Sequence, residues 1–277
     1  LLGDGPALKA ALGDPAAESA IGVRDVDEWR QAVLARQPAA VVSAGPVPAE
    51  TVARELDRIF AGFATPAGTR AAKPALRALG KLVVLEHPTV QTAIVAGGPT
   101  GWVTDTNAFV GRLAVRVLGG GFNSRLTKAV REGLGATYGI RASLQQIHPE
   151  AFALNIATQV DSTKAAATLE AGRREYARLR EGGVAGEEVE PLKTRLVTEM
   201  REQFRRSSGA AQSLRDIVLV GLPAAYAATF AERVQAISAD SVSAGIRERM
   251  PAPPLTIVMV APSAEGLGAD CVIKSPE

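Results

Sequence analysis

The apolar positions before the middle of the chain predict two helices with three glycines between them. In residues 103–118 apolar side chains go nearly all round the helix, which predicts that it is covered on more than one side. Residues 119–121 are all glycine and can take a positive φ angle, so we expect the chain to reverse sharply there. Ser124 is the predicted N-cap of the second helix, and Gly133 and Gly135 end it.

From Tyr138 the apolar period changes to two, which predicts a strand. The residues that share the predicted face of Tyr138 are Ile140, Ala142 and Leu144. Arg131 then lies in the last turn of the second helix, and Tyr138 lies at the first position of the strand. Because only a glycine-bearing reversal separates them, we expect their polar tips to meet at one rim of a sheet.

In the remainder of the chain, segments with the helical spacing of apolar residues alternate with segments that have the two-residue spacing of a strand. Strands are predicted at 81–86, 91–97, around 152–156 and at 255–261, and helices at 26–34, 49–63, 161–180 and from 187 onwards. We expect the first two strands to form a pair or a strand-bend-strand unit, and the third to be joined to the Tyr138 strand through residues 148–150. The predicted fold class is α+β, with an antiparallel-rich sheet packed by helices.

The chain also predicts a division into domains. Residues 1–63 are expected to form helices with a short buried strand at 39–44, and to be the C-terminal part of a first domain. Residues 64–79 contain two prolines, one glycine and three basic residues without a period, which predicts an interdomain linker. Residues 80–262 are expected to form one complete domain, and residues 263–277 a tail in loop conformation.

A loose internal repeat supports this division. GDPAA at residues 13–17 has a counterpart in GLPAA at residues 221–225, and a helix, an apolar strand and a proline follow in the same order after each. The offset is close to the length of a domain, so we expect two tandem copies in the parent protein. Coincidence between two helix-strand-helix segments is the alternative.

Composition excludes several classes of function. The 277 residues are 47% apolar and 22% charged, with a net charge of +2, which is typical of a globular protein and gives no large field for nucleic acid or a membrane surface. The longest apolar run, 255–261, is too short to cross a bilayer. The single cysteine, Cys271, excludes an internal disulfide.

The histidines do not form a metal-binding motif of their own. The chain has two, His87 and His148, which lie 148 − 87 = 61 residues apart. Neither belongs to an HxxEH motif, so we expect no zinc site within this chain and interpret the two as a loop residue and a turn residue. The three glycines complete neither GxGxxG nor GxxxxGK[ST], which leaves nucleotide or small-molecule binding as the weaker alternative.

The segment LGGGFNSRLTKAVREGLGATY, residues 118–138, resembles the pattern LGGGxxSRLxxxxRExxGxxY of the non-catalytic half of the insulinase/pitrilysin family of zinc metallopeptidases. With its flanking elements the resemblance covers about residues 10–262. It implies that Arg131 and Tyr138 face a zinc site from the opposite half, with Tyr138 donating to the substrate carbonyl oxygen or its oxyanion and Arg131 anchoring a nearby carbonyl. On spacing alone, Arg131 is instead a partner of the helix dipole and Tyr138 a core aromatic.

The resemblance further implies a partner that carries HxxEH and holds the zinc, either a separate catalytic subunit or the N-terminal half of a longer chain. The substrate is then a peptide or unfolded protein, bound as an added strand on the catalytic half. A purely structural subunit of the same fold is the main alternative. The Ala- and Arg-rich composition and a start at Leu1, without methionine, favour a trimmed chain of bacterial origin from the periplasm.

Overall fold

The structure is a computed structural model, and it describes residues 15–33, 40–63, 73–102, 108–148, 150–219 and 221–274. The chain divides into two compact units. One comprises Leu1–Gly3, Lys73–Val197 and Ala231–Glu277, and the other comprises Asp4–Ala72 and Thr198–Phe230. The predicted domain boundaries and the internal repeat stay predictions.

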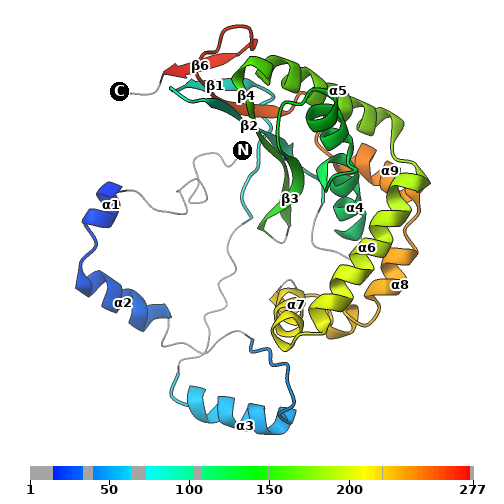
Figure 1. Ribbon diagram of the computed structural model, residues 1–277. Coiled ribbons are helices and arrows are strands. Elements are labelled where there is room, and N and C mark those ends of the chain that lie inside the picture. Colours follow the sequence, from blue (N-terminus) through cyan, green and yellow to red (C-terminus); the bar gives the residue numbers. More distant parts are fainter. Residues whose placement is uncertain are drawn as a thin grey trace. The chain divides into compact units, whose positions relative to one another are not determined.

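A six-stranded mixed sheet forms the centre of the first unit, in the order β3-β4-β2-β5-β1-β6 (Figure 1). The strands are β1 Leu82–Glu86, β2 Gln91–Pro99, β3 Ile140–His148, β4 Ala151–Asp161, β5 Thr256–Ala261 and β6 Cys271–Lys274. The pairs β3/β4, β4/β2 and β2/β5 are antiparallel, whereas β5/β1 and β1/β6 are parallel. The predicted α+β class with an antiparallel-rich sheet is confirmed.

Of the two predicted arrangements of β1 and β2, the direct strand pair is wrong, whereas the strand-bend-strand unit is present, with a bend at residue 90. β5 lies between them, pairing in parallel with β1 from Leu82↔Ile257 and antiparallel with β2 from Ala93↔Val260. An apolar run of this kind fits either arrangement, because periodicity specifies a strand but not its neighbour. The hairpin between β3 and β4 is confirmed, with Ile140 opposite Thr158.

The prediction that residues 263–277 form only loop is also wrong. β6 pairs in parallel with β1, where Cys271 lies opposite Val83. All four residues of β6 are exposed, and Val272 and Ile273 are 46% and 49% exposed. A four-residue edge strand without a buried face has no alternating pattern by which the sequence could reveal it.

Two helices, α4 Ala108–Gly119 and α5 Ala165–Gly182, pack on the sheet, and α9 Ala239–Arg249 packs against both of them (Figure 1). α4 is buried nearly all round, as its apolar pattern predicts: Phe109, Leu113, Val115 and Val117 are at most 5% exposed. α5 follows a single 3₁₀ turn that Asp161 caps, because its Oδ1 accepts from the Thr163 backbone N–H at 2.8 Å. The predicted start of this helix at residue 161 is confirmed.

Between α5 and α9 the described chain contains the α-helices α6 Gly186–Phe204, α7 Ser207–Leu219 and α8 Phe230–Gln235. α6 begins in the first unit and ends in the second. Glu187 and Glu188 lie in its first turn, as predicted for carboxylates at a helix N-terminus.

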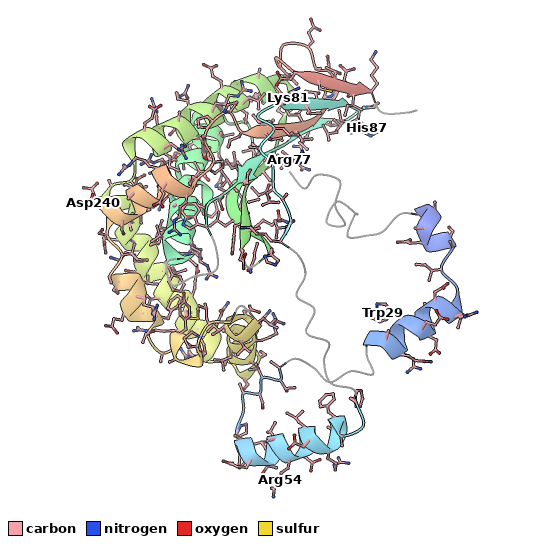
Figure 2. All side chains as sticks on the ribbon, turned by 180° about the vertical axis from the view of Figure 1, so that it is seen from behind. Trp29, Arg54, Arg77, Lys81, His87 and Asp240 are labelled. Atoms are coloured by element: carbon pink, nitrogen blue, oxygen red, sulfur yellow. The ribbon has the colours of Figure 1, made fainter. Side chains whose placement is uncertain are left out.

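The front of the chain contains α1 Pro15–Ser19, α2 Val23–Val33 and α3 Ala49–Phe60. Trp29 on α2 is 58% exposed and, like Arg54 on α3, is labelled in Figure 2. The predicted buried strand at 39–44 is wrong where the structure describes it, since residues 40–44 have no regular structure and Val41 is 48% exposed. A strand needs a neighbour for its N–H and C=O groups, and no described strand pairs with this segment.

Candidate functional site

Gly119 allows the end of α4 to lie against β3, and Gly120 packs against the preceding turn of α4. A Cβ on Gly119 would lie 2.6 Å from the backbone nitrogen of Ala142, and one on Gly120 would lie 2.4 Å from the Cα of Arg116. None of residues 119–121 has a positive φ angle. The predicted reversal is therefore present but for a different reason: glycine is needed here for close approach of the backbone and not for a left-handed conformation.

After this reversal Ser124 fixes the start of the second helix. Its side chain is 5% exposed, and its hydroxyl contacts the Gly121 carbonyl at 2.6 Å and the Thr127 Oγ1 at 2.9 Å. The helix continues as a π-helical segment, Thr127–Gly133, and Gly135 follows with φ +55°. The short helix is confirmed, but its π form was not predicted; such segments are rare and frequent at functional sites.

A bidentate ion pair anchors the beginning of this helix, and the sequence did not reveal it. Arg125 donates from Nε and Nη2 to the two carboxylate oxygens of Glu188 at 2.8 and 2.7 Å, and from Nη2 to the Gly183 carbonyl at 2.8 Å. These hydrogen bonds lower the pKa of Glu188 and raise the pKa of Arg125. The helix that carries Arg131 is thereby fixed to the start of α6, 63 residues further along the chain.

Tyr138 lies in the loop before β3 and not at the first position of the strand. β3 begins at Ile140, and hydrogen bonds of Thr137 and Gly139 precede it: Gly139 N–H donates to Thr137 Oγ1 at 3.1 Å, and the Thr158 hydroxyl donates to the Gly139 carbonyl at 3.0 Å. The Tyr138 side chain is 94% exposed. The alternative that Tyr138 is a core aromatic is therefore wrong.

Arg131 lies in the last turn of the π-helical segment, as predicted. Its Cζ lies 4.8 Å from the centroid of the Phe122 ring, and the residue is half-buried. Within the described residues its guanidinium forms no ion pair or hydrogen bond. Five donors on a planar group are therefore available to a ligand.

The structure brings Arg131 and Tyr138 to one open pocket of about 380 Å³. The glycine reversal, Phe122 and Thr127 line one part of it, and the start of β3 with Arg141 lines the other. The lining contains two guanidinium groups and one phenol but no carboxylate. Such a surface favours carbonyl oxygens and anions over cationic groups.

A second hollow, of about 410 Å³, lies next to this pocket and shares Tyr138, Gly139 and Ala157 with it. Thr137 and residues of β2 and β4, including Gln91 and Gln159, supply the rest of its lining. Tyr138 therefore lies between two hollows on the surface of the first unit, and both are open to solvent.

The two histidines lie outside this site. His87 follows β1 directly and is exposed (Figure 2), whereas His148 is the last residue of β3 and accepts from the Glu150 backbone N–H at 3.2 Å. In the part of the chain that the structure describes, no three His, Cys, Asp or Glu side chains are placed to hold a metal ion. No helix there is long and apolar enough to span a bilayer.

Comparison with known families identifies the fold. The profile of the family described as "Peptidase M16 inactive domain" matches residues 20–196, which is more than half of the chain and includes Arg131 and Tyr138. The chain belongs to this family. The resemblance to the non-catalytic half of the insulinase-type peptidases is thereby confirmed. No curated protein sequence matches the chain.

Solved structures share the M16 fold at low sequence identity. The M16 inactive domain from Pseudomonas fluorescens has a TM-score of 0.81 and 20% identity, covering 100% of this chain and 64% of that one. The periplasmic protease PqqL from Escherichia coli has a TM-score of 0.66 and 11% identity, and the match covers 79% of this chain and 25% of that one. A chain of complex III2 from Candida albicans has a TM-score of 0.65 and 12% identity, and the match covers 80% of this chain and 54% of that one. The chain thus spans less than two thirds of the length of each.

Proposed function

We propose that this M16 inactive domain is the non-catalytic half of a zinc metalloendopeptidase, and that it holds a peptide substrate against a zinc site on a partner. The partner carries HxxEH and is either a separate subunit or the N-terminal half of a longer chain. The observation that carries the proposal is that Arg131 and Tyr138 line one open pocket, each with polar groups available to a ligand.

Tyr138 is the residue proposed to act on the scissile carbonyl. A partner-bound zinc ion supplies Lewis acidity and an activated water. The phenol of Tyr138 donates a hydrogen bond to the carbonyl oxygen, and this bond strengthens as negative charge develops on that oxygen. Because the side chain is 94% exposed in the described chain, the phenol is free to reach an atom that another subunit presents.

Arg131 is proposed to position the substrate. Its guanidinium lies over the Phe122 ring and has no carboxylate partner among the described residues. It can therefore donate a hydrogen bond to a peptide carbonyl, or two parallel hydrogen bonds to a carboxylate. The neighbouring hollow lined by β2 and β4 provides room for the adjacent residues of an extended peptide.

Reconstitution with an HxxEH-bearing partner tests this proposal. We expect the isolated chain to cleave no peptide and to bind no stoichiometric zinc, and the mixture to gain peptidase activity. Arg131→Ala should raise KM for a peptide substrate by about tenfold or more, because a charge-assisted hydrogen bond contributes about 1.5–3 kcal/mol. A reconstituted activity that Arg131→Ala leaves unchanged would refute the assigned role.

A structural subunit is the second candidate function, and the likeness to a chain of complex III2 favours it. A subunit of that kind joins its partner in a stable assembly without peptidase activity. Purification of the native complex, followed by assay with a mixture of unfolded peptides, distinguishes the two functions.

A further inference from the structure

A third hollow, a cavity of about 450 Å³, lies between α5 and the sheet, and residues of β2, β3, β4 and β5 line it. Its inner wall is apolar and buried: Ile94, Leu126, Ile140, Ile156, Leu169 and Ile257 are at most 8% exposed. It shares Ile140 with the pocket of Arg131 and Tyr138, but neither Arg131 nor Tyr138 lines it. A cavity of this size and lining is typical of a site for a small apolar molecule.

The mouth of the cavity is formed by Arg173, Pro253 and Pro254, which are exposed. Arg173 belongs to α5, and its guanidinium forms no ion pair or hydrogen bond with any described residue. An unpaired cation at the entrance of an apolar cavity complements a ligand that has an anionic head and an apolar body.

The wall contains a polar group that lacks a partner. The hydroxyls of Thr158 and Tyr176 are satisfied, since they donate to the Gly139 carbonyl at 3.0 Å and to the Pro251 carbonyl at 2.7 Å. Thr168, one and a half turns before Arg173 on α5, is 3% exposed, and its Oγ1 has no hydrogen-bond partner in the described chain. This Oγ1 is closed off from the cavity as well as from solvent, so a ligand in the cavity does not reach it, and the polar end of a ligand has to lie at the mouth.

We propose that this cavity is a binding site for a medium-chain aliphatic carboxylate. The carboxylate lies at the α5 side of the mouth, where it accepts hydrogen bonds from Arg173. The aliphatic chain occupies the apolar interior formed by the sheet. Because neither Arg131 nor Tyr138 lines this cavity, the proposal does not depend on the peptidase function.

Isothermal titration calorimetry of the 277-residue chain with decanoate, below its micelle concentration, tests the proposal. We expect saturable binding of one decanoate per chain. Arg173→Gln should weaken decanoate by about ten- to a hundredfold and leave 1-decanol unchanged, because only the charged head interacts with the guanidinium. Thr168→Val, which keeps the shape of the side chain, should leave both ligands unchanged, because the Thr168 hydroxyl is closed off from the cavity.

Two matched controls accompany these variants. Arg174→Gln removes the next arginine, which pairs with Glu175 at 3.9 Å and does not line the cavity, and should leave binding unchanged. A Cβ at Gly172 or at Gly182 meets no atom within 4 Å, but only Gly172 lines the cavity. Gly172→Leu should therefore abolish binding of both ligands, and Gly182→Leu should not.

Thermal unfolding of each variant establishes that it is folded before titration. The proposal is overturned if decanoate shows no saturable binding to the wild-type chain. It is equally overturned if Arg173→Gln binds decanoate as tightly as Arg174→Gln does, or if Gly172→Leu binds as Gly182→Leu does.

Discussion

The guanidinium of Arg131 lies over the ring of Phe122, with 4.8 Å between Cζ and the ring centroid. Phe122 is 72% exposed, so its ring contributes little to the core. A cation–π contact at an exposed site stabilises by about 0.5–1 kcal/mol, which is enough to favour one orientation of a long side chain. Phe122 therefore holds the arginine toward the pocket that both residues line.

This contact predicts a functional effect of Phe122 with little effect on stability. Phe122→Ala should raise KM of the reconstituted peptidase several-fold and change the free energy of unfolding by less than about 1 kcal/mol. Phe122→Tyr retains an aromatic ring and should retain KM. Steady-state kinetics of the two variants, with urea unfolding of each, provide the comparison; equal KM values for Phe122→Ala and wild type would contradict it.

The close approach of α4 to β3 predicts that two neighbouring glycines differ in their tolerance of alanine. Gly119→Ala places a methyl group 2.6 Å from the backbone nitrogen of Ala142 and should destabilise the fold by about 1–3 kcal/mol. At Gly121 the nearest atom to a Cβ is Arg195 Nη1 at 3.8 Å, and φ is not positive, so Gly121→Ala should be within about 0.5 kcal/mol of wild type.

Urea unfolding of both glycine variants measures this difference directly. If the three glycines were needed for positive φ, as the sequence pattern first indicates, both substitutions would be costly. Equal destabilisation by Gly119→Ala and Gly121→Ala would therefore contradict the close-approach explanation.

The ion pair between Arg125 and Glu188 predicts a dependence of stability on pH. The pKa of Glu188 is lower in the folded chain than in the unfolded chain, chiefly because it accepts hydrogen bonds from Arg125. Its contribution to stability is therefore fully present above the unfolded pKa of about 4.3 and is lost as pH falls through the folded pKa. At pH 7, Glu188→Gln should cost about 1–3 kcal/mol.

Urea unfolding of wild type and Glu188→Gln between pH 7 and pH 3 measures this contribution. The difference between them should be constant at neutral pH and decrease below about pH 4.3. Glu187→Gln is the matched control, since Glu187 is the exposed neighbour in the same helical turn. A difference that stays constant down to pH 3 would show that the ion pair does not lower the pKa of Glu188.

The location of zinc on the partner predicts different effects of a chelator on this chain and on the complex. The described residues include no group of three metal-ligating side chains, so the melting temperature of the isolated chain should be unchanged by a chelator such as EDTA. The reconstituted peptidase should lose its activity and recover it when zinc is restored. A lowered melting temperature of the isolated chain would place a structural metal in it.

Local patterns in the sequence predicted much of the first unit. Ile140 and Ala142 alternate toward the buried face of β3, and Asp161 caps the turn before α5. These features depend on neighbours within a few residues, whose spacing the sequence displays. The segment with Arg131 and Tyr138 was recognised in the same way, through a pattern of 21 consecutive residues, 118–138.

Features that depend on distant partners could not be predicted. β5 lies between β1 and β2, although more than 150 residues separate it from either. The Arg125–Glu188 pair likewise joins residues 63 positions apart. The sequence places Tyr138 in the strand because it shares the two-residue spacing of Ile140, Ala142 and Leu144. In the structure, side-chain hydrogen bonds of Thr137 and Thr158 hold residues 137–139 as a loop, so β3 begins at Ile140.

The kinetics of Tyr138→Phe in the reconstituted complex test the central claim most directly. The substitution removes one hydroxyl from a side chain that is 94% exposed, so the fold and the pocket should be retained. Loss of a hydrogen bond to the developing oxyanion should lower kcat by about 10²–10³ while KM stays within a few-fold of wild type. An unchanged kcat in an active, zinc-dependent complex would contradict the proposed role of this chain in catalysis.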